Sequence, residues 1–232
     1  LHCGLMPRTV VATGIGAVSC RGSGIDALWD AMLEGRTGLG PIQRFDPSGF
    51  TSRLGGELDD FSAKSFVPKT YRKAVKVMAR DIELAVAAAN QAVLDADLTT
   101  RFVAIADDDL TYRPGRLGCQ IGAGLIATNT SEISAALATS MLETDDGPQF
   151  SWLRWGSESG AGPGEGGAMN NLQPLWLLKY LPNMLACHVT ILHGAEGPSN
   201  TITCGEASGL LSVGEAARVI ARGAADACCA GG

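Results

Sequence analysis

Two residues with chemically useful side chains, Cys204 and Glu206, stand on either side of one glycine late in the chain. A cysteine thiolate can take an acyl group from a thioester, and a helix N-terminus beside it favours the charged form. A carboxylate in the same surroundings can act as a general acid or base. The segment that holds these two residues is therefore the first place to look for chemistry.

The sequence around these residues has the pattern of a βαβ unit. Asn200 to Cys204 is rich in β-branched residues, Glu206 to Arg222 is apolar on almost every side, and Ala225 to Ala230 is a second strand-like run. A helix that is apolar all round is buried. We therefore expect a buried helix N-terminus, whose unpaired N–H groups and dipole favour an anion or oxyanion.

The rest of the chain alternates strand-like and helix-like segments, which predicts an α/β fold. Tyr71 to Leu94 is the clearest helix, because apolar residues repeat along it every three or four positions. We expect 36–69 to be a long surface excursion and 143–171 to be a mobile loop. The other expected elements are strands at Thr9 to Thr13 and Leu117 to Ile121, and helices at Ile25 to Leu33, Ser131 to Leu142, Leu175 to Leu181 and Asn183 to Leu192.

The composition is that of a globular domain and argues against several functional classes. With 232 residues, of which 46% are hydrophobic and 18% charged, the chain can bury a sizeable core. A net charge of −6 argues against a general nucleic-acid binder. No apolar stretch is long enough for a membrane span, and the N-terminus lacks the order of a signal peptide. We expect a cytoplasmic protein.

The cysteines and glycines give no sign of a metal or cofactor. Seven cysteines lack the spacing of a zinc site, and their odd number favours reduced thiols. Cys228 and Cys229 are neighbours on a strand, so they should point to opposite faces. Gly14-Ile15-Gly16 could begin a dinucleotide-binding turn, but Ser19 stands where the third glycine should be. We therefore expect neither a cofactor nor a metal.

Several blocks of the sequence resemble one known family. PSNTITCGEASGLLSVGEAARVIARGAADACCAGG at 198–232 is similar, without a gap, to the nucleophile-elbow block of β-ketoacyl-acyl carrier protein synthases. VVATGIGAVS, GRTGLGPIQRFDPSGF, MARDIELAVAAANQAV and PNMLACHVTILHGAEGPS resemble earlier blocks of the same family and come in the family's order. The resemblance covers nearly the whole chain.

The resemblance implies a thiolase-like fold, in which two similar halves form a five-layered αβαβα sandwich with a mixed sheet and a buried nucleophile-elbow helix. Residues 7–232 would then be the N-terminal half, while 1–6 would be a tag or a disordered N-terminus. The C-terminal half, which normally supplies two catalytic histidines, a lysine and a glycine-rich loop, has no counterpart in this sequence.

Counting back from Ser208-Gly209, the family's nucleophilic cysteine falls on Glu206. A carboxylate is a poor nucleophile toward a thioester, because it would form a labile mixed anhydride. Cys204 is the alternative nucleophile, although a strand residue before the elbow lacks the helix-end amides, and packing in the core is the role we expect for it. For Glu206 itself, helix capping and a functional role both remain open.

Relatives without the cysteine suggest two functions. Chain length factors pair with a competent synthase in fatty acid or polyketide synthesis and shape the acyl tunnel, whereas decarboxylating synthase domains carry glutamine. An ionised Glu206 would repel a malonyl carboxylate, which favours the chain length factor. The alternative is an active 3-oxoacyl synthase-type acyltransferase or malonyl decarboxylase that uses Glu206 with residues of the absent half. A scaffold without an acyl pocket is a third possibility.

The resemblance also implies partners. Lys69, Arg72, Lys73 and Lys76 gather where the family often receives the acidic acyl carrier protein, although a solvated helix face would look the same. The strand at 200–204 is expected to make the dimer contact, either with a second copy or with a cysteine-containing ketosynthase. His188 is expected to be a structural, hydrogen-bonded histidine.

Overall fold

The computed structural model describes residues 8–104, 106–156 and 167–232, and it divides into two compact units. The first unit combines Leu1–Gly124 with Pro182–Gly232, and the second is Leu125–Leu181. Residues 1–6, where we expected a tag or a disordered end, lie outside the described residues. The first unit contains β1 (Val18–Ser19), β2 (Gly22–Ser23), α1 (Ile25–Leu33), β3 (Leu39–Pro41), β4 (Leu54–Gly56), α2 (Arg80–Asp95), β5 (Leu117–Gly122), α5 (Met184–His193), β8 (Ser199–Ile202), α6 (Ser208–Ala221) and β9 (Ala227–Gly231).

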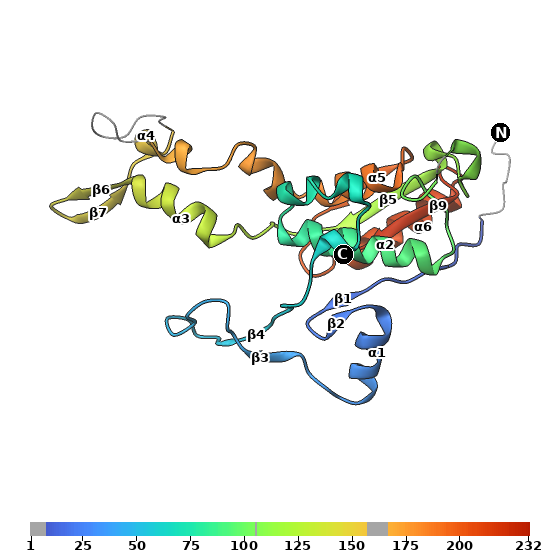
Figure 1. Cartoon of the computed structure of the whole chain (residues 1–232), viewed down its shortest axis with the longest axis horizontal. Helices are drawn as coiled ribbons and strands as arrows, with labels where there is room; N and C mark the ends of the chain where they lie inside the picture. The colour runs from blue at the N-terminus through green and yellow to red at the C-terminus, as the bar shows by residue number, and fades with distance from the viewer. Residues whose placement is uncertain (1–7, 105, 157–166) are drawn as a thin grey trace. The chain divides into compact units, whose positions relative to one another are not determined.

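The core of the first unit is a parallel three-stranded sheet in the order β8-β5-β9, of which Figure 1 labels β5 and β9. Every residue of the central strand, LGCQIG, is buried. Apart from Gln120, whose side chain donates a hydrogen bond to the Pro198 carbonyl, the residues are small or apolar without alternation, which suits a strand that is covered on both faces. The predicted βαβ unit is confirmed as β8, α6 and β9, with β5 lying between its two strands.

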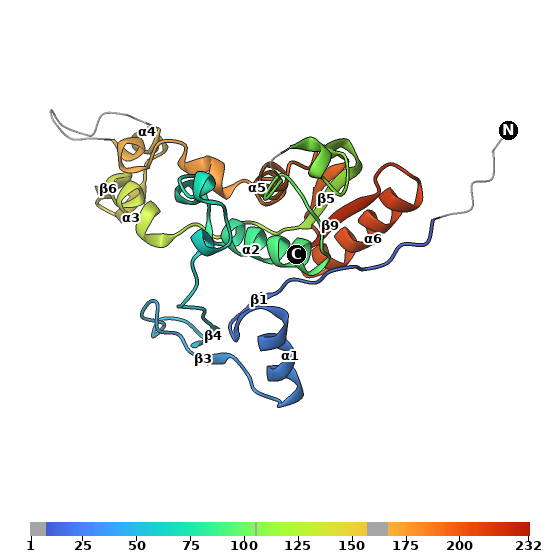
Figure 2. The same ribbon diagram turned by 45° about the vertical axis from the view of Figure 1, so that its right-hand side comes forward.

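The helices α5 and α6 lie on opposite sides of this sheet (Figure 2). A Cβ at Gly122 would run into the backbone of α6, so that face of β5 carries α6. Cys119 points to the other face, because side chains alternate along a strand. Cys228 is opposite Gly118 and Cys229 is opposite Cys119. The two neighbouring cysteines therefore point to opposite faces, as predicted.

The predicted strand at Thr9 to Thr13 is wrong as a paired strand, because this part of the chain is extended but joins no sheet among the described residues. The segment lies against α2 instead, where Asp95 accepts a hydrogen bond from the Ile15 N–H. A Cβ at Gly16 would run into the carbonyl oxygen of Ala88. Gly16 therefore allows this segment to pack closely against α2, and Val11 remains 70% exposed.

The long helix begins nine residues later than its apolar pattern predicts. Lys69–Tyr71 and Ala74–Val77 form short 3₁₀ turns, Met78 is extended, and α2 proper starts at Arg80. Asp81 and Glu83 stand in the first turn of α2, where the helix dipole favours negative charge. By contrast, α1 has the bounds that the sequence predicts.

The excursion at 36–69 is not wholly irregular, because β3 and β4 pair as an antiparallel hairpin. A second small hairpin joins β1 to β2 just before α1. Trp29, Met32 and Leu33 of α1 and Leu39 of β3 are exposed. This part of the first unit therefore presents several large apolar side chains on its surface.

The second unit contains α3 (Thr130–Thr139), β6 (Met141–Thr144), β7 (Gly147–Phe150) and α4 (Trp152–Trp155). The predicted helix at 131–142 ends three residues early, where β6 begins an antiparallel hairpin with β7. The predicted mobile loop at 143–171 is therefore partly regular, and its residues 157–166 lie outside the described ones.

Lys179 is buried and pairs with Glu132 at 2.6 Å, while Tyr180 donates a hydrogen bond to the same carboxylate. Trp176–Tyr180 is a 3₁₀ turn, where a helix at 175–181 was expected.

A candidate elbow site

The ends of two parallel strands and the start of one helix enclose a hollow of about 530 Å³ in the first unit. The strand ends contribute small residues, since β5 runs into Gly-Ala-Gly and β9 into Gly-Gly. The residues that line the hollow are Gly122, Ala123, Gly124, Gly205, Glu206, Ser208, Gly209, Leu210, Val213, Gly231 and Gly232. The sequence predicted a site at the elbow but did not predict that the ends of β5 and β9 also line it. The glycines that follow both strands were a usable signal, because parallel strands end at the same edge of a sheet.

Three glycines allow these segments to meet. A Cβ at Gly122 would run into the backbone of Ser208 and Gly209, and a Cβ at Gly209 would lie 2.9 Å from the Gly232 carbonyl oxygen. A Cβ at Gly232 would in turn run into the backbone of Gly122. Larger residues at these positions would push helix α6 away from the strand ends, so the glycines set the shape of the hollow.

Glu206 lies in the turn before α6 and is exposed, which corrects the prediction that it occupies a buried helix terminus. The turn is made by hydrogen bonds from the Ala207 N–H to the Cys204 carbonyl and from the Ser208 N–H to the Gly205 carbonyl. Gly205 has a φ of 56°, which L-residues rarely adopt. The helix therefore starts at Ser208, two residues later than predicted.

The hollow is acidic at its rim. Among the described residues that line it, Glu206 is the one ionisable side chain, and no lysine or arginine is present. An exposed carboxylate keeps its hydration, so no compensating cation is required. A second anion placed in the hollow would meet the charge of Glu206 without a neutralising partner.

The other predicted nucleophile, Cys204, is exposed and lies beyond the end of β8. Our expectation that it packs in the core as a strand residue is therefore wrong. The strand β8 ends at Ile202, and the chain then turns toward α6. Cys204 is also absent from the residues that line the hollow.

The helix α6 is not buried all round, contrary to its apolar sequence. Its sheet-facing residues Ser208, Ser212, Ala216 and Val219 are buried. On the other side Leu210 is 81% exposed, and Val213 and Leu211 are also exposed. Leu210 and Val213 line the hollow, so an apolar wall stands beside the acidic rim.

The basic cluster of Lys69, Arg72, Lys73 and Lys76 is exposed throughout. Lys69 and Lys76 lie in the two 3₁₀ turns before α2, and Arg72 and Lys73 lie between these turns, so none of the four is on the long helix where they were expected. In the described part of the chain none of the four takes part in an ion pair. Their charges are therefore free to meet an anionic partner.

Two buried histidines have structural contacts instead of a place at the elbow. The hydroxyl of Tyr71 lies 3.1 Å from Nδ1 of His188, which confirms the predicted hydrogen-bonded histidine. Thr100 makes the corresponding contact with His193 at 2.9 Å. Burial lowers the pKa of His188 and lowers that of His193 to about 4. Both rings are therefore neutral near pH 7.

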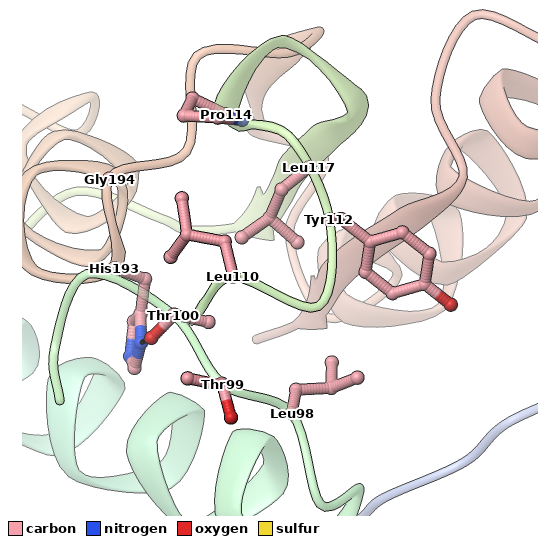
Figure 3. Close-up of a pocket in the computed structure, with 9 residues that line it drawn as sticks. All are labelled: Leu98, Thr99, Thr100, Leu110, Tyr112, Pro114, Leu117, His193 and Gly194. Atoms are coloured by element: carbon pink, nitrogen blue, oxygen red, sulfur yellow. Dashed lines mark hydrogen bonds between the residues drawn. The ribbon is translucent and has the colours of Figure 1, made fainter. Parts of the chain in front are cut away.

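A second void lies beside His193 (Figure 3). It is lined by Leu98, Thr99, Thr100, Leu110, Tyr112, Pro114, Leu117, His193 and Gly194, and it holds about 10 Å³. This volume admits at most a single water molecule. The void is therefore too small to be a substrate site.

The six described cysteines are free thiols. Burial raises the pKa of Cys119, and burial together with the neighbouring Cys228 raises that of Cys229 to about 12. These two thiols are therefore unreactive near neutral pH. Within 8–104, 106–156 and 167–232, no three His, Cys, Asp or Glu side chains are grouped to hold a metal ion. No helix among these residues is both long and apolar enough to cross a membrane.

Comparison with known families gives one assignment for almost the whole chain. The family model described as "Beta-ketoacyl synthase, N-terminal domain" matches residues 7–232. A granaticin polyketide putative β-ketoacyl synthase 1 of Streptomyces violaceoruber is 34% identical over 227 residues, which are 97% of this chain and 46% of the relative. The 3-oxoacyl-[acyl-carrier-protein] synthase 2 of a Synechocystis species is 31% identical over 98% of this chain and 46% of its own length. The chain thus spans about half the length of these curated relatives.

Solved structures agree with these matches. The ishigamide ketosynthase/chain length factor is 26% identical, with a TM-score of 0.65 over 94% of this chain and 45% of the other. A β-ketoacyl synthase from Burkholderia phymatum has the same TM-score at 23% identity, over 95% of this chain and 45% of that one. The predicted thiolase-like α/β fold is confirmed by these likenesses.

Proposed function

Because the chain belongs to the β-ketoacyl synthase family, whose N-terminal domain it matches over residues 7–232, we propose that it works as a chain-length-factor-like subunit. In this role it shapes an acyl tunnel beside a cysteine-containing ketosynthase and does not itself accept the acyl chain. Residues 7–232 would form the N-terminal half of the double fold. One solved relative is a ketosynthase/chain length factor, which supports the proposal.

The observation that carries the proposal is the carboxylate at the rim of the elbow hollow. By resemblance, Glu206 occupies the position of the family's nucleophilic cysteine. A carboxylate attacks a thioester poorly, because the anhydride product is less stable than the thioester it replaces. The exposed Cys204 does not line the hollow, so it does not replace the missing thiol.

The charge of Glu206 also argues against a decarboxylase. A malonyl group carries its own carboxylate, and the lining of the hollow offers no lysine or arginine to neutralise it. Two carboxylates about 4 Å apart repel each other by about 1 kcal/mol even in water. A neutral acyl chain, which could rest on Leu210 and Val213, meets no such penalty.

The direct test is to incubate the protein with acyl- and malonyl-loaded carrier protein and to follow intact mass and products. We expect no acyl adduct and no decarboxylation by the purified protein alone. We expect a changed product chain length when it is added to a cysteine-containing ketosynthase. An acyl adduct, or carbon dioxide released from the malonyl thioester, would replace the proposal with the acyltransferase or decarboxylase alternative.

The basic cluster is the proposed docking site for the acidic carrier protein. Lys69, Arg72, Lys73 and Lys76 are exposed and have no ion-pair partner in the described part of the chain. Surface charges of this kind steer association and are screened by salt. The double reversal Lys69→Glu with Lys73→Glu should weaken carrier-protein binding by about tenfold at low salt.

The matched control reverses two charges elsewhere. Arg218 and Arg222 are exposed near the end of α6, where they pair with Glu215. The variant Arg218→Glu with Arg222→Glu changes the net charge by the same amount. Equal loss of carrier-protein affinity in both double variants, measured by titration calorimetry at low and high salt, would refute a localised docking site.

A further inference from the structure

The turn that carries Glu206 is closed by the side chain of Ser208 as well as by its two backbone hydrogen bonds. Ser208 is only 5% exposed, and its hydroxyl makes two hydrogen bonds to the turn. Oγ accepts from the Cys204 N–H at 2.8 Å and donates to the Gly205 carbonyl at 2.6 Å. The hydroxyl therefore joins the residues just before Glu206 to the first residue of α6.

The first bond satisfies the Cys204 N–H, and the second adds to the bond that the Ser208 N–H already makes to the Gly205 carbonyl. Cys204 follows the end of β8, so its N–H is no longer paired within the sheet. A hydroxyl has one hydrogen to donate and lone pairs to accept, and both functions are used here. Glu206 and Ala207 lie inside the loop that Ser208 closes, so the path of the backbone at 206 depends on this side chain together with the backbone bonds of the turn.

The backbone of Ser208 is also held in place by its contact with β5. It packs so closely on Gly122 that no Cβ could fit between them. Ser208 is therefore held by β5 on one side and holds the turn on the other. A side chain that joins a rigid strand end to the residue at the rim of a site is well placed to orient that residue.

We propose that Ser208 is the positioning residue of the elbow, whose hydroxyl directs the side chain at position 206 to the rim of the hollow. It touches no ligand itself and acts through the backbone of the turn. The inference concerns the same hollow as the proposed function. Its test uses no carrier protein, so the two can fail separately.

The neighbouring Ser212 provides a matched control. It is fully buried one helical turn further along α6, and its hydroxyl also bonds to backbone carbonyls. Those carbonyls belong to Gly209 and Gly231, at 2.6 and 2.9 Å, and not to the turn. Loss of either hydroxyl should lower the stability of α6, but only loss of the Ser208 hydroxyl should change the position of the side chain at 206.

The experiment places a reporter thiol at the rim by the substitution Glu206→Cys in a Cys204→Ala background. Alkylation by iodoacetamide is followed against pH, and mass spectrometry of peptides identifies the modified cysteine. A thiol held at the start of α6 should titrate below the ordinary value of about 8.5. Adding Ser208→Ala should raise the pH at which alkylation of the reporter thiol reaches half its maximal rate, and it should slow alkylation at pH 7 by about fivefold. Adding Ser208→Thr should restore both.

Adding Ser212→Ala should lower thermal stability and leave the midpoint of the reporter unchanged. An identical midpoint with and without the Ser208 hydroxyl would overturn the proposal, as would an equal shift in the two alanine variants. If Ser208→Ala does not fold, Gly205→Ala takes its place. Nothing lies within 4 Å of a Cβ at Gly205, so this substitution causes no clash and disturbs the turn only because alanine disfavours a φ of 56°. It should therefore also raise the pH midpoint of alkylation of the reporter cysteine.

Discussion

The charge at position 206 can be separated from its shape by the substitution Glu206→Gln. Glutamine keeps the size of the side chain and removes the negative charge from the rim of the hollow. We expect binding of malonyl-loaded carrier protein to strengthen by about fivefold, which corresponds to about 1 kcal/mol of relieved repulsion. Acetyl-loaded carrier protein is the control, because its acyl group is neutral. Equal strengthening for both ligands, measured by calorimetry, would rule out repulsion by Glu206.

A second prediction at the residue scale concerns pH. Burial lowers the pKa of His193 to about 4, below the value of about 6.5 expected in the unfolded chain. As pH falls below about 6.5, the unfolded state binds a proton that the folded state does not, so stability falls. Between pH 7 and pH 5 this loss should be about 2 kcal/mol from His193.

The substitution His193→Gln tests this assignment, because glutamine can still bond to Thr100 but does not titrate. Urea unfolding of the variant at pH 7 and pH 5 should show a smaller loss of stability than the parent chain. Some loss should remain, since burial also lowers the pKa of His188. The same pH dependence in the variant and the parent would show that His193 is not the titrating group.

At the residue scale the sequence could identify Glu206 but not its surroundings. Its position followed from the spacing to Ser208-Gly209, which is local information. Its exposure depends on the turn closed by the Ser208 hydroxyl and on strand ends about 85 residues and 25 residues away in the chain. Such contacts leave no local pattern, which is why Cys204 was wrongly expected in the core.

At the scale of elements, contact between the N-terminal segment and α2 depends on glycine. A Cβ at Gly16 would meet the Ala88 carbonyl oxygen and the Ala92 N–H, which both belong to the helix backbone and cannot move aside. Gly16→Ala should therefore lower the free energy of unfolding by about 1–3 kcal/mol. Gly115→Ala, where nothing lies within 4 Å, should change it by less than about 0.5 kcal/mol. Urea denaturation that gave both variants the same stability would contradict the close contact.

The elements themselves were predicted with uneven success. The helix α1 and the unit of β8, α6 and β9 follow from apolar periodicity and glycine breaks. The start of α2 was misplaced because Val75 and Met78 are buried from 3₁₀ and extended positions that happen to continue the helical spacing. Periodicity reports which residues are buried and does not by itself report the backbone that buries them.

At the scale of the whole molecule, the apolar sequence of α6 predicted burial on all sides, yet Leu210 and Val213 are exposed in this chain. Composition alone cannot say whether an apolar face is covered by the same chain or by another one. The same holds for the sheet, because β8 pairs with β5 on one side and with no other described strand. An unpaired edge strand is a ready template for another chain.

The dimer contact proposed for this edge can be tested with a charge. Asn200 is exposed on β8, and Asn200→Lys would bring a lysine to the contact; in a homodimer, the two copies of the lysine would repel each other across the axis. We expect the dissociation constant, for a second copy or for a cysteine-containing ketosynthase, to rise by about tenfold or more in sedimentation velocity. Asn200→Gln, which adds length without charge, should associate like the parent chain. Unchanged association of the lysine variant with both partners would exclude the β8 edge as the contact.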